Sequence, residues 1–273
     1  MENELVEIPH VGVGFRGPIA DWVLSKPESI DCVEVTAEHF FDSGEDILRE
    51  LSQSYPVYVH GLGLSLGTPD PLDSVALRRF CRVAEIADPD WISEHIAFTK
   101  SGDVELGHLN PVPCTARTLQ TLVDHAREVM DLCQKPLILE NITAFLPLPG
   151  EMSETEFINQ LCDTSGVGLL LDVTNLLINS RNHNFDPAEW LRELNPDHIV
   201  QLHIVGYSVR DGVWLDHHAA SVQDDLLELM QEVVAYAPVQ AIILERDAHF
   251  PPVSEIEAEL VRLEDACEAA RLR

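Results

Sequence analysis

The chain has 273 residues, of which 45% are hydrophobic, and 47 acidic against 17 basic residues give it a formal net charge of -30 at pH 7. This hydrophobic content excludes a disordered protein, and the length suits one (β/α)8 barrel, which needs about 250 residues. A surface this acidic repels nucleic-acid phosphates and anionic lipids, and no apolar run reaches the roughly 20 residues of a membrane span. We therefore expect a protein without nucleic-acid or membrane partners.

Cysteine usage and the first residues predict the compartment. The six cysteines contain no CxxC pair and are spread along the chain, at Cys32, Cys81, Cys114, Cys133, Cys162 and Cys267. Such spacing favours reduced thiols over a disulfide framework or a sulfur-rich metal site. The N-terminal residues are acidic and lack the cationic start and apolar core of a signal peptide. We expect a cytoplasmic protein.

Eight short apolar runs rich in β-branched residues recur along the chain, and we expect each to be a buried strand. In chain order they are Val11–Arg16, Cys32–Ala37, Val57–Leu62, Trp91–Phe98, Leu137–Ile142, Gly168–Thr174, Ile199–Gly206 and Ala241–Asp247. Between them, apolar residues recur with a helical period in Leu72–Ala87, Thr115–Leu132, Leu226–Val234 and Ile256–Leu263. We expect Thr115 to cap its helix, and Ser153 to open a further helix through a capping box.

The regular alternation of strands and helices predicts an α/β protein, a (β/α)8 TIM barrel that forms a single domain over residues 1–273. An open, doubly wound sheet is the alternative. The first strand lacks the GxGxxG loop of nucleotide-binding sheets, because Gly12, Gly14 and Gly17 have a different spacing.

Most of the predicted strands carry an ionisable side chain near their C-terminal end. These are Arg16, Glu34, His60, His95, Glu140, Asp172, His203 and Glu245. In a barrel, the C-terminal ends of the strands meet at one rim, where active sites are built. Carboxylates and imidazoles inside apolar runs are costly to bury unless they are hydrogen-bonded or bind a cation.

Glu, Asp and His side chains at six of these strand ends predict a multinuclear metal centre. Glu140 is the natural bridge, because its two oxygens can hold two cations. A hydrogen-bonded core histidine is the alternative for His60, and a salt bridge to the adjacent Arg246 is the alternative for Glu245. The expected ligands are His60, His95, Glu140, Asp172, His203 and Glu245.

Two segments beyond the strands add candidate ligands. In the loop Asp216-His217-His218, residues two apart share a face of an extended chain, so we select Asp216 and His218 and leave out His217. After the sixth strand, Asn175 and His183 lie in a polar run that is either a further pair of ligands or a turn before the next helix.

Six motifs, taken in order, resemble one known family. They are His60-Gly-Leu-Gly-Leu-Ser-Leu-Gly, Ser93-Glu-His-Ile-Ala-Phe, Leu139-Glu-Asn-Ile, Leu171-Asp-Val-Thr-Asn, Asn182-His-Asn-Phe-Asp and Glu245-Arg-Asp. From Val11 to Asp247 the chain resembles the DUF692 proteins, the multinuclear non-haem iron-dependent oxidative enzymes. Members of that family build the oxazolone–thioamide of methanobactin and excise the β-carbon of a peptidyl cysteine.

The resemblance implies a xylose-isomerase-like barrel that holds two or three irons in mixed Fe(II)/Fe(III) states. It also implies an oxidoreductase that uses O2 to modify a ribosomally synthesised precursor peptide, at cysteine, with a small peptide-recognition protein as partner. Position by position, the three irons would be bound by His60, His95 and Glu140; by Glu140, Asp172, His203 and Glu245; and by Asn175, His183, Asp216 and His218.

One position departs from the family pattern. After the seventh strand the family has His-x-x-Gly-His, whereas this chain has His203-Ile-Val-Gly-Tyr207. A tyrosine can form a hydrogen bond but cannot replace a neutral imidazole, so Tyr207 either tunes the cluster or packs against the following loop. The family's proline-rich, substrate-facing loop after the fourth strand is matched by residues 109–114, in which we expect Cys114 to be an ordinary loop residue.

Two other classes of function fit the same ligand types. A zinc or manganese enzyme on this barrel would be a sugar isomerase or a phosphodiesterase, because ligand types alone do not separate zinc, manganese and iron. The phosphodiesterase is disfavoured by the net charge of -30. A non-catalytic metal-binding protein would bind the metal without consuming O2.

Overall fold

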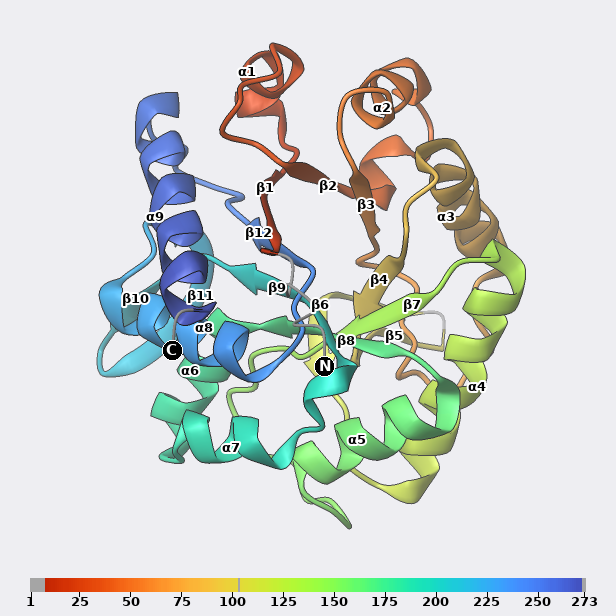
Figure 1. Cartoon of the computed structure of the whole chain (residues 1–273). Coiled ribbons are helices and arrows are strands. Elements are labelled where there is room, and N and C mark those ends of the chain that lie inside the picture. Colours follow the sequence, from red (N-terminus) through yellow and green to blue (C-terminus); the bar gives the residue numbers. More distant parts are fainter. Residues whose placement is uncertain (1–7, 103, 272–273) are drawn as a thin grey trace, which may run out of the picture.

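The structure, a computed structural model, describes residues 8–102 and 104–271. In this part of the chain, eight parallel strands close into a barrel in the order β1-β12-β9-β8-β7-β4-β3-β2, with the helices outside (Figure 1). The barrel strands are β1 (His10–Gly14), β2 (Cys32–Thr36), β3 (Val57–His60), β4 (Ile92–His95), β7 (Leu137–Glu140), β8 (Gly168–Asp172), β9 (Ile199–Ile204) and β12 (Ala241–Leu244). The predicted TIM barrel is confirmed.

The helices fill the intervals between the barrel strands. They are α1 (Ala20–Leu24), α2 (Glu45–Ser52), α3 (Ser74–Ala87), α4 (Ala116–Cys133), α5 (Glu154–Ser165), α6 (Val173–His183), α7 (Pro187–Glu193), α8 (Asp224–Tyr236) and α9 (Val253–Arg271). The two predicted caps are confirmed, because Thr115 Oγ1 accepts from the backbone N–H of Thr118 and Ser153 Oγ accepts from that of Glu156. No helix in the described ranges has both the length and the apolar character needed to cross a membrane.

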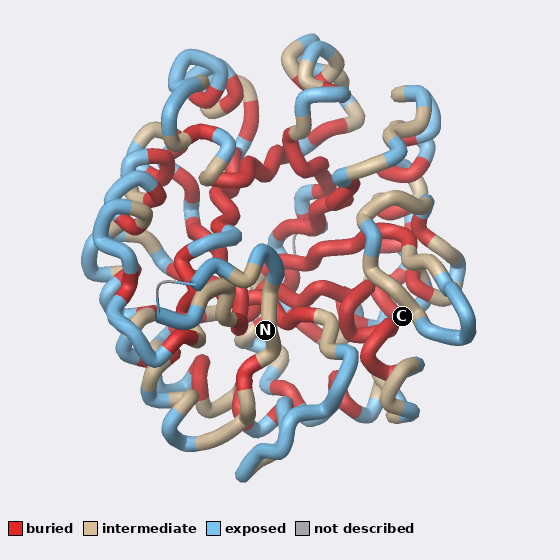
Figure 2. The backbone as a smooth tube through the Cα atoms, turned by 180° about the vertical axis from the view of Figure 1, so that it is seen from behind, coloured by how far each residue is buried: buried red, intermediate tan, exposed pale blue. Residues whose placement is uncertain are grey.

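Alternate residues of the strands face the barrel interior and divide it into two layers. The layer near the N-terminal ends of the strands is apolar and contains Cys32, Tyr58, Trp91, Ile138, Leu170, Ala241 and Ile243. Two residues further along five of these strands, the interior positions are occupied by Glu34, His60, Glu140, Asp172 and Glu245. The strand backbones are buried while the outer helix faces are exposed, as Figure 2 shows, so these five ionisable groups lie in the centre of the molecule.

Two antiparallel hairpins that the sequence did not predict rise from the C-terminal rim. The strand expected over Trp91–Phe98 is too long, because β4 ends at His95 and the chain turns into β5 (Ala97–Ser101), which pairs with β6 (Val104–Pro111). The expected loop that carries Asp216 and His218 is instead β11 (Val213–Ala220), paired with β10 (Gly206–Arg210).

The polar run after the sixth strand is also not a turn. It forms α6, which begins at Val173 because Asp172 Oδ1 accepts from the backbone N–H of Asn175 at 2.7 Å and caps the helix. The sixth strand therefore ends at Asp172, two residues before the predicted end.

The prediction that all six cysteines are free is wrong for one pair. Cys81 of α3 and Cys133 at the end of α4 form a disulfide, with Cα atoms 4.7 Å apart and a sequence separation of 52 residues. The two helices pack side by side outside the barrel, which brings together cysteines that no sequence motif connects. Cys32, Cys114, Cys162 and Cys267 are free thiols.

Candidate metal centre

The register of the barrel strands sets the predicted ligands side by side. In the pairing of β4 with β7, His95 lies opposite Glu140, and in the pairing of β8 with β9, Asp172 lies opposite His203. Each of these residues is the interior-facing residue at or near the C-terminal end of its strand. The parallel pairing of these strands therefore brings four side chains from separate sequence motifs into one cluster.

Glu140 lies at the middle of this cluster. Its Oε2 is 3.3 Å from Nε2 of His60 and 3.2 Å from Nε2 of His95. Its Oε1 is 3.4 Å from Nδ1 of His203. The two oxygens of one carboxylate thus face two different sets of imidazoles, as a bridging ligand requires.

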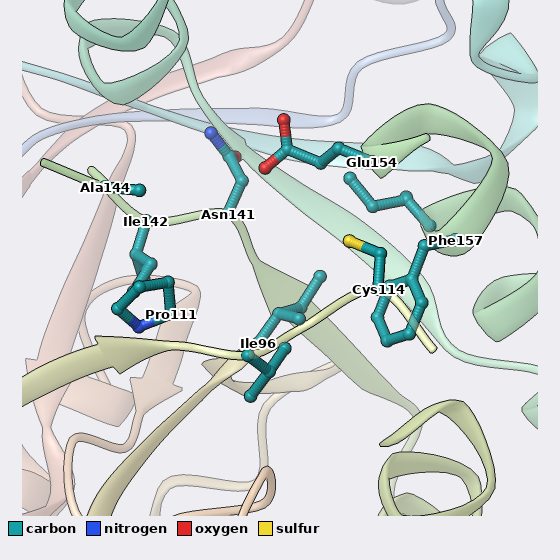
Figure 3. Close-up of a pocket in the computed structure, with 10 residues that line it drawn as sticks. Ile96, Pro111, Cys114, Asn141, Ile142, Ala144, Glu154 and Phe157 are labelled. Carbon is teal, nitrogen blue, oxygen red and sulfur yellow. The ribbon is translucent and has the colours of Figure 1, made fainter. Parts of the chain in front are cut away.

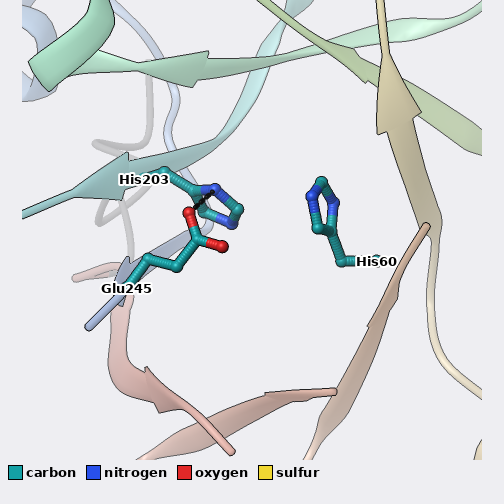
Figure 4. A group of neighbouring side chains, drawn as sticks. All are labelled: His60, His203 and Glu245. Carbon is teal, nitrogen blue, oxygen red and sulfur yellow. Dashed lines mark ion pairs between the residues drawn. The ribbon is translucent and has the colours of Figure 1, made fainter. Parts of the chain in front are cut away.

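Four groups of side chains have the spacing needed to hold a cation. They are His60, His95 and Glu140; Glu140, Asp172, His203 and Glu245; His60, His203 and Glu245; and His218, Glu245 and Asp247. The first two groups are the ligand sets predicted for the first and second irons. Figure 4 shows His60, His203 and Glu245 pointing toward one another across the barrel, with an ion pair between Nδ1 of His203 and Oε2 of Glu245 at 3.0 Å.

The fourth group includes a residue that the sequence analysis missed. Nδ1 of His218 is 3.1 Å from Oδ2 of Asp247 and 3.6 Å from Oε2 of Glu245, while its Nε2 is 2.8 Å from Oδ2 of Asp216. The rule that residues two apart share a face selected Asp216 and His218, and applied to Glu245 it would also have found Asp247. Arg16, at the end of β1, pairs with both acids: its Nε is 2.6 Å from Asp247 Oδ1 and its Nη2 is 3.3 Å from Glu245 Oε1.

The buried polar atoms of the cluster test whether cations fit. In the described chain, eight of these atoms have no hydrogen-bond partner, although buried polar groups normally have one. They are His60 Nε2, His95 Nδ1, Glu140 Oε2, Asp172 Oδ2, Asn175 Oδ1, His203 Nδ1, Asp216 Oδ1 and His218 Nδ1. All eight are oxygen or imidazole nitrogen atoms, the donor types of Fe, Mn and Zn sites, so the residues present fit bound metal ions.

Without metal ions, protons take the place of cations in this cluster. Burial alone would lower the pKa of His95, but the carboxylates of Glu140 and Glu94 outweigh it and raise this pKa to about 9. Burial is likewise overcome at His218, where Glu245, Asp216 and Asp247 raise the pKa to about 12. At His60, burial and the neighbouring imidazoles His95 and His203 lower the pKa well below its usual value.

The carboxylates show the same charge balance. Burial, with repulsion from Glu140 and Asp216, raises the pKa of Asp172 well above its ordinary value. Burial opposes ionisation of Glu245 as well, but His203 and His218 hold its pKa well below the ordinary value. A cluster that takes up protons to balance its carboxylates is one that divalent or trivalent cations would stabilise.

Neighbouring residues hold two of the imidazoles in place. His60 Nδ1 lies 2.8 Å from Ser93 Oγ. His95 Nδ1 lies 3.5 Å from Oε2 of Glu94, whose Oε1 accepts from the backbone N–H of Leu64. The Ser93 contact engages the ring nitrogen of His60 that faces away from Glu140, and both Nε2 atoms are directed at Glu140, the usual arrangement around metal-binding histidines.

The two ligands predicted on α6 have different surroundings. Asn175 is buried beside Asp172, and its Nδ2 donates to the carbonyl of Asn141 at 3.1 Å, which leaves Oδ1 without a partner. His183 belongs to none of the four groups found in the described residues, and its Nε2 lies 2.6 Å from the carbonyl oxygen of Ala144. A role for His183 as a ligand remains a prediction.

Among the described residues, the hydroxyl of Tyr207 forms no hydrogen bond with a predicted ligand. Its hydroxyl lies 3.1 Å from Oδ1 of Asp225, and its ring packs against Trp214, with 4.4 Å between ring centroids. These contacts support the packing role for Tyr207 over a role in tuning the cluster.

Two adjoining cavities lie beside the cluster, and the smaller is lined by residues that follow the C-terminal ends of β4 and β7. The smaller, of about 50 Å³, is shown in Figure 3 and includes Asn141 and Ile96, the residues that follow Glu140 and His95. The larger, of about 340 Å³, shares Cys114 with it and extends to the exposed side chains Leu146 and Leu148. Burial, with a contribution from Glu154, raises the pKa of Cys114 to about 11, so this residue remains a neutral thiol at pH 7, in line with an ordinary loop role.

Comparison with known proteins assigns the family. Residues 10–268 match the model of the RiPP precursor modification enzymes MbnB/TglH/ChrH, where RiPP denotes a ribosomally synthesised and post-translationally modified peptide. The chain belongs to this family. A UPF0276 protein of Chromobacterium violaceum is 33% identical over 262 residues, 94% of this chain and 95% of that protein. Another, of Streptomyces avermitilis, is 37% identical over 272 residues, 96% of this chain and 56% of a longer protein. The family assignment confirms the resemblance seen in the sequence.

Solved structures with low sequence identity share the fold. An L-ribulose 3-epimerase superposes with a TM-score of 0.62 at 11% identity, covering 96% of each chain. Endonuclease IV from Thermus thermophilus has a TM-score of 0.62 at 14% identity, covering 96% of this chain and 99% of its own. The IOLI protein, solved with a bound zinc atom, has a TM-score of 0.54 at 13% identity and covers 96% of this chain and 97% of its own. These likenesses place the chain among xylose-isomerase-like TIM barrels and show the fold alone.

Proposed function

We propose that this protein is an O2-dependent oxidoreductase that holds two or three iron ions and modifies a ribosomally made precursor peptide at cysteine. The observation that supports this most directly is the position of Glu140. Its two oxygens face two sets of buried ligands, so that two cations bound there would be neighbours in one cluster.

The residues divide into the three predicted ligand sets. His60, His95 and Glu140 would hold the first ion, and Glu140, Asp172, His203 and Glu245 the second. Asp216 and His218 would hold a third ion, together with Asn175, which was predicted from the sequence. Asp247, which the structure adds to this group, would be a further oxygen ligand. His183 is the least supported member of this set. Imidazole and carboxylate ligands leave iron with open positions, and the bound iron supplies the redox chemistry with O2 and the site for a substrate thiolate.

The protein's own groups arrange the substrate and exclude water. Hairpins β5–β6 and β10–β11 rise beside the rim, and the apolar cavities open next to it. The described residues that line the larger cavity include Glu154 and Glu193 and no lysine or arginine. We therefore propose that it takes an apolar side chain of the peptide, and that basic residues flank that side chain. A small partner protein that recognises the peptide, and a cytoplasmic location, complete the proposal.

Metal loading followed by a peptide reaction tests the proposal. The protein is loaded with Fe(II) under low oxygen, its iron is counted, and Mössbauer spectra are recorded. A synthetic cysteine-containing peptide, taken from an open reading frame beside the gene, is then added with O2. We expect O2 consumption that depends on the peptide, and a change in peptide mass that a Cys→Ser peptide does not show.

Two results would replace the proposal. Sugar epimerisation by protein loaded with Mn(II) or Zn(II), without O2, would assign a metal-dependent isomerase. Stoichiometric iron binding without any O2 consumption, in the presence of the peptide and of the neighbouring small protein, would assign a metal-binding protein.

A further inference from the structure

A chain of buried hydrogen bonds runs through the barrel from its N-terminal end to the metal centre. Trp91 Nε1 donates to Gln201 Oε1 at 2.7 Å, and Gln201 Nε2 donates to Glu34 Oε2 at 2.6 Å. The other oxygen of Glu34, Oε1, lies 2.8 Å from Nε2 of His203. All four side chains are at most 7% exposed, and they come from β2, β9 and the residue that precedes β4.

Trp91, the first residue in this series of hydrogen bonds, determines which group donates and which accepts in each later hydrogen bond. An indole N–H can only donate, so Gln201 must present its carbonyl oxygen to Trp91 and its NH2 group to Glu34. The indole ring is itself held by stacking on Tyr58, with 4.4 Å between centroids and 14° between planes. The amide of Gln201 therefore has one orientation rather than two.

The same constraint determines which ring nitrogen of His203 carries a proton. Nε2 of His203 lies 2.8 Å from Oε1 of Glu34 and 3.3 Å from Nε2 of Gln201. A carboxylate can only accept, so the shorter of the two contacts requires a proton on Nε2 of His203. Nδ1 of the same ring faces Glu245 Oε2 at 3.0 Å and Glu140 Oε1 at 3.4 Å. Which nitrogen of a metal-binding histidine is free is decided by the hydrogen bond that the other one makes.

We infer that Trp91, Gln201 and Glu34 are positioning residues that hold His203 with a proton on Nε2, so that Nδ1 is the nitrogen that binds metal. None of the three is itself a predicted ligand. The inference rests on the proposed metal centre, but not on iron, O2 or a peptide substrate. It makes the affinity of the centre depend on an indole at the opposite end of the barrel interior.

Metal affinity in conservative variants tests the inference, with Zn(II) alone as the probe. We expect Glu34→Gln and Trp91→Phe each to weaken Zn(II) binding about 10- to 100-fold, the usual effect of losing an outer hydrogen bond to a ligand. Trp190→Phe is the matched control, because Trp190 is also buried and its Nε1 donates to a carboxylate of Glu154 at 3.0 Å, away from the cluster. Thermal unfolding of the metal-free variants separates lost affinity from lost folding.

The double variant gives a readout that a merely structural role would not produce. In Glu34→Gln, the amide introduced at position 34 faces the NH2 group of Gln201. The hydrogen bond from Trp91 prevents the Gln201 amide from turning to present its oxygen instead. Adding Trp91→Phe frees Gln201 to turn and accept from the new amide. We therefore expect the double variant to bind Zn(II) no more weakly than Glu34→Gln alone, whereas independent structural defects would add.

The protonated nitrogen can also be observed directly. In Zn(II)-loaded protein with ¹⁵N-labelled histidine, long-range ¹H–¹⁵N spectra should show His203 with a proton on Nε2 and Zn(II) on Nδ1. Coordination through Nε2, or unchanged affinity in both single variants, overturns the inference while the metal centre stands. Failure of the wild-type protein to bind Zn(II), Fe(II) or Mn(II) at the cluster overturns both proposals.

Discussion

At the scale of single residues, Glu140 is the side chain on which the cluster depends most. Its carboxylate contacts His60, His95 and His203 through both oxygens. Replacing it removes an oxygen ligand from two of the proposed ligand sets at once. The three imidazoles would then face each other without a shared anion, which weakens their binding of any cation.

We therefore expect Glu140→Ala to lose more than one metal ion per chain, measured by elemental analysis after loading with Fe(II). Glu38→Ala is a suitable control, because the Glu38 carboxylate accepts from the backbone N–H groups of Leu62 and Gly63 and belongs to none of the four candidate cation groups of the described residues. Full metal content in Glu140→Ala would remove the bridging role.

A second prediction concerns the pH dependence of metal binding. The raised pKa of His95, about 9, means that a metal ion must displace a proton from this ring at neutral pH. Affinity for Zn(II) at the group His60, His95 and Glu140 should therefore rise with pH up to about 9, by up to about tenfold per pH unit for each proton released. Competition with a chromophoric chelator across this range measures it, and an affinity that does not change with pH would contradict the protonation of the cluster.

Stability of the metal-free protein should change in the opposite direction. His95 has a pKa of about 9 in the folded protein, against about 6.5 in an unfolded chain. Its pairing with Glu140 and Glu94 thus adds stability that is complete below the unfolded pKa and is lost as the pH rises through the folded one. The melting temperature of metal-free protein should fall over this window, while that of metal-loaded protein should not.

Tyr207 provides a further prediction at this scale. Because its hydroxyl bonds to Asp225 and not to a ligand, Tyr207→Phe should leave metal content and turnover within about twofold of wild type. Loss of one partly exposed hydrogen bond costs about 1 kcal/mol or less of folding free energy. Chemical denaturation and steady-state rates measure the two effects. A large fall in turnover at full metal content would return Tyr207 to the role of tuning the cluster.

At the scale of elements, the hairpin β10–β11 presents Asp216 and His218, and α6 holds it in place. The side-chain amide of Asn182 forms two hydrogen bonds with the backbone of Trp214, as a neighbouring strand would. Nδ2 donates to the carbonyl of Trp214 at 2.9 Å, and Oδ1 accepts from the N–H of Trp214 at 3.0 Å. Arg181 covers the Trp214 ring from the same helix, with Cζ 5.5 Å from the ring centroid. Asn182 is thus one of the contacts that fix the positions of the predicted hairpin ligands.

We expect Asn182→Ala to loosen this hairpin and to weaken the third metal position, while the positions formed by barrel strands keep their metal. Hydrogen exchange of residues 213–220 and metal stoichiometry measure the two effects. Asn182→Asp, which retains only the accepting hydrogen bond, should lie between wild type and Asn182→Ala. Unchanged exchange in Asn182→Ala would show that Tyr207, Arg181 and the hairpin itself suffice.

At the scale of the whole molecule, the net charge of -30 predicts the kind of peptide that associates fastest. Long-range attraction to a basic peptide raises the association rate and is screened by salt, because the Debye length falls to about 10 Å at 0.1 M ionic strength. We expect association with the cognate peptide to slow markedly from low to high salt, as measured by stopped-flow fluorescence. A charge-reversed peptide is the control, and an association rate independent of salt would leave the charge a role in solubility only.

Much of the fold follows from local rules that a sequence displays. All eight barrel strands lie in or within one residue of the predicted apolar runs, and two helix starts were predicted from side chains that cap their own first turn. The convergence of the six predicted ligands at one rim was predictable for the same reason. Interior-facing residues alternate along each strand, and the C-terminal ends of parallel strands share one rim.

Most of the features that these local rules did not predict depend on contacts between distant segments of the chain. The hairpins and the Cys81–Cys133 disulfide arise where elements pack, and no local period predicts them. The helix at Val173 has a local signal, the Asp172 cap, which the sequence analysis did not use. The pairing of Arg16 with Asp247 joins residues 231 positions apart, and that of Gln201 with Glu34 joins residues 167 positions apart.

By itself the sequence determined that imidazoles and carboxylates would meet at one end of a parallel barrel, because period and strand direction are local properties of the chain. Only the tertiary structure decided which carboxylate faces which imidazole, which nitrogen of His203 is free, and that His183 lies against Ala144. Closing the barrel brings β1 against β12 and sets the stagger of every strand, and contacts of about 3 Å between side chains depend on that stagger.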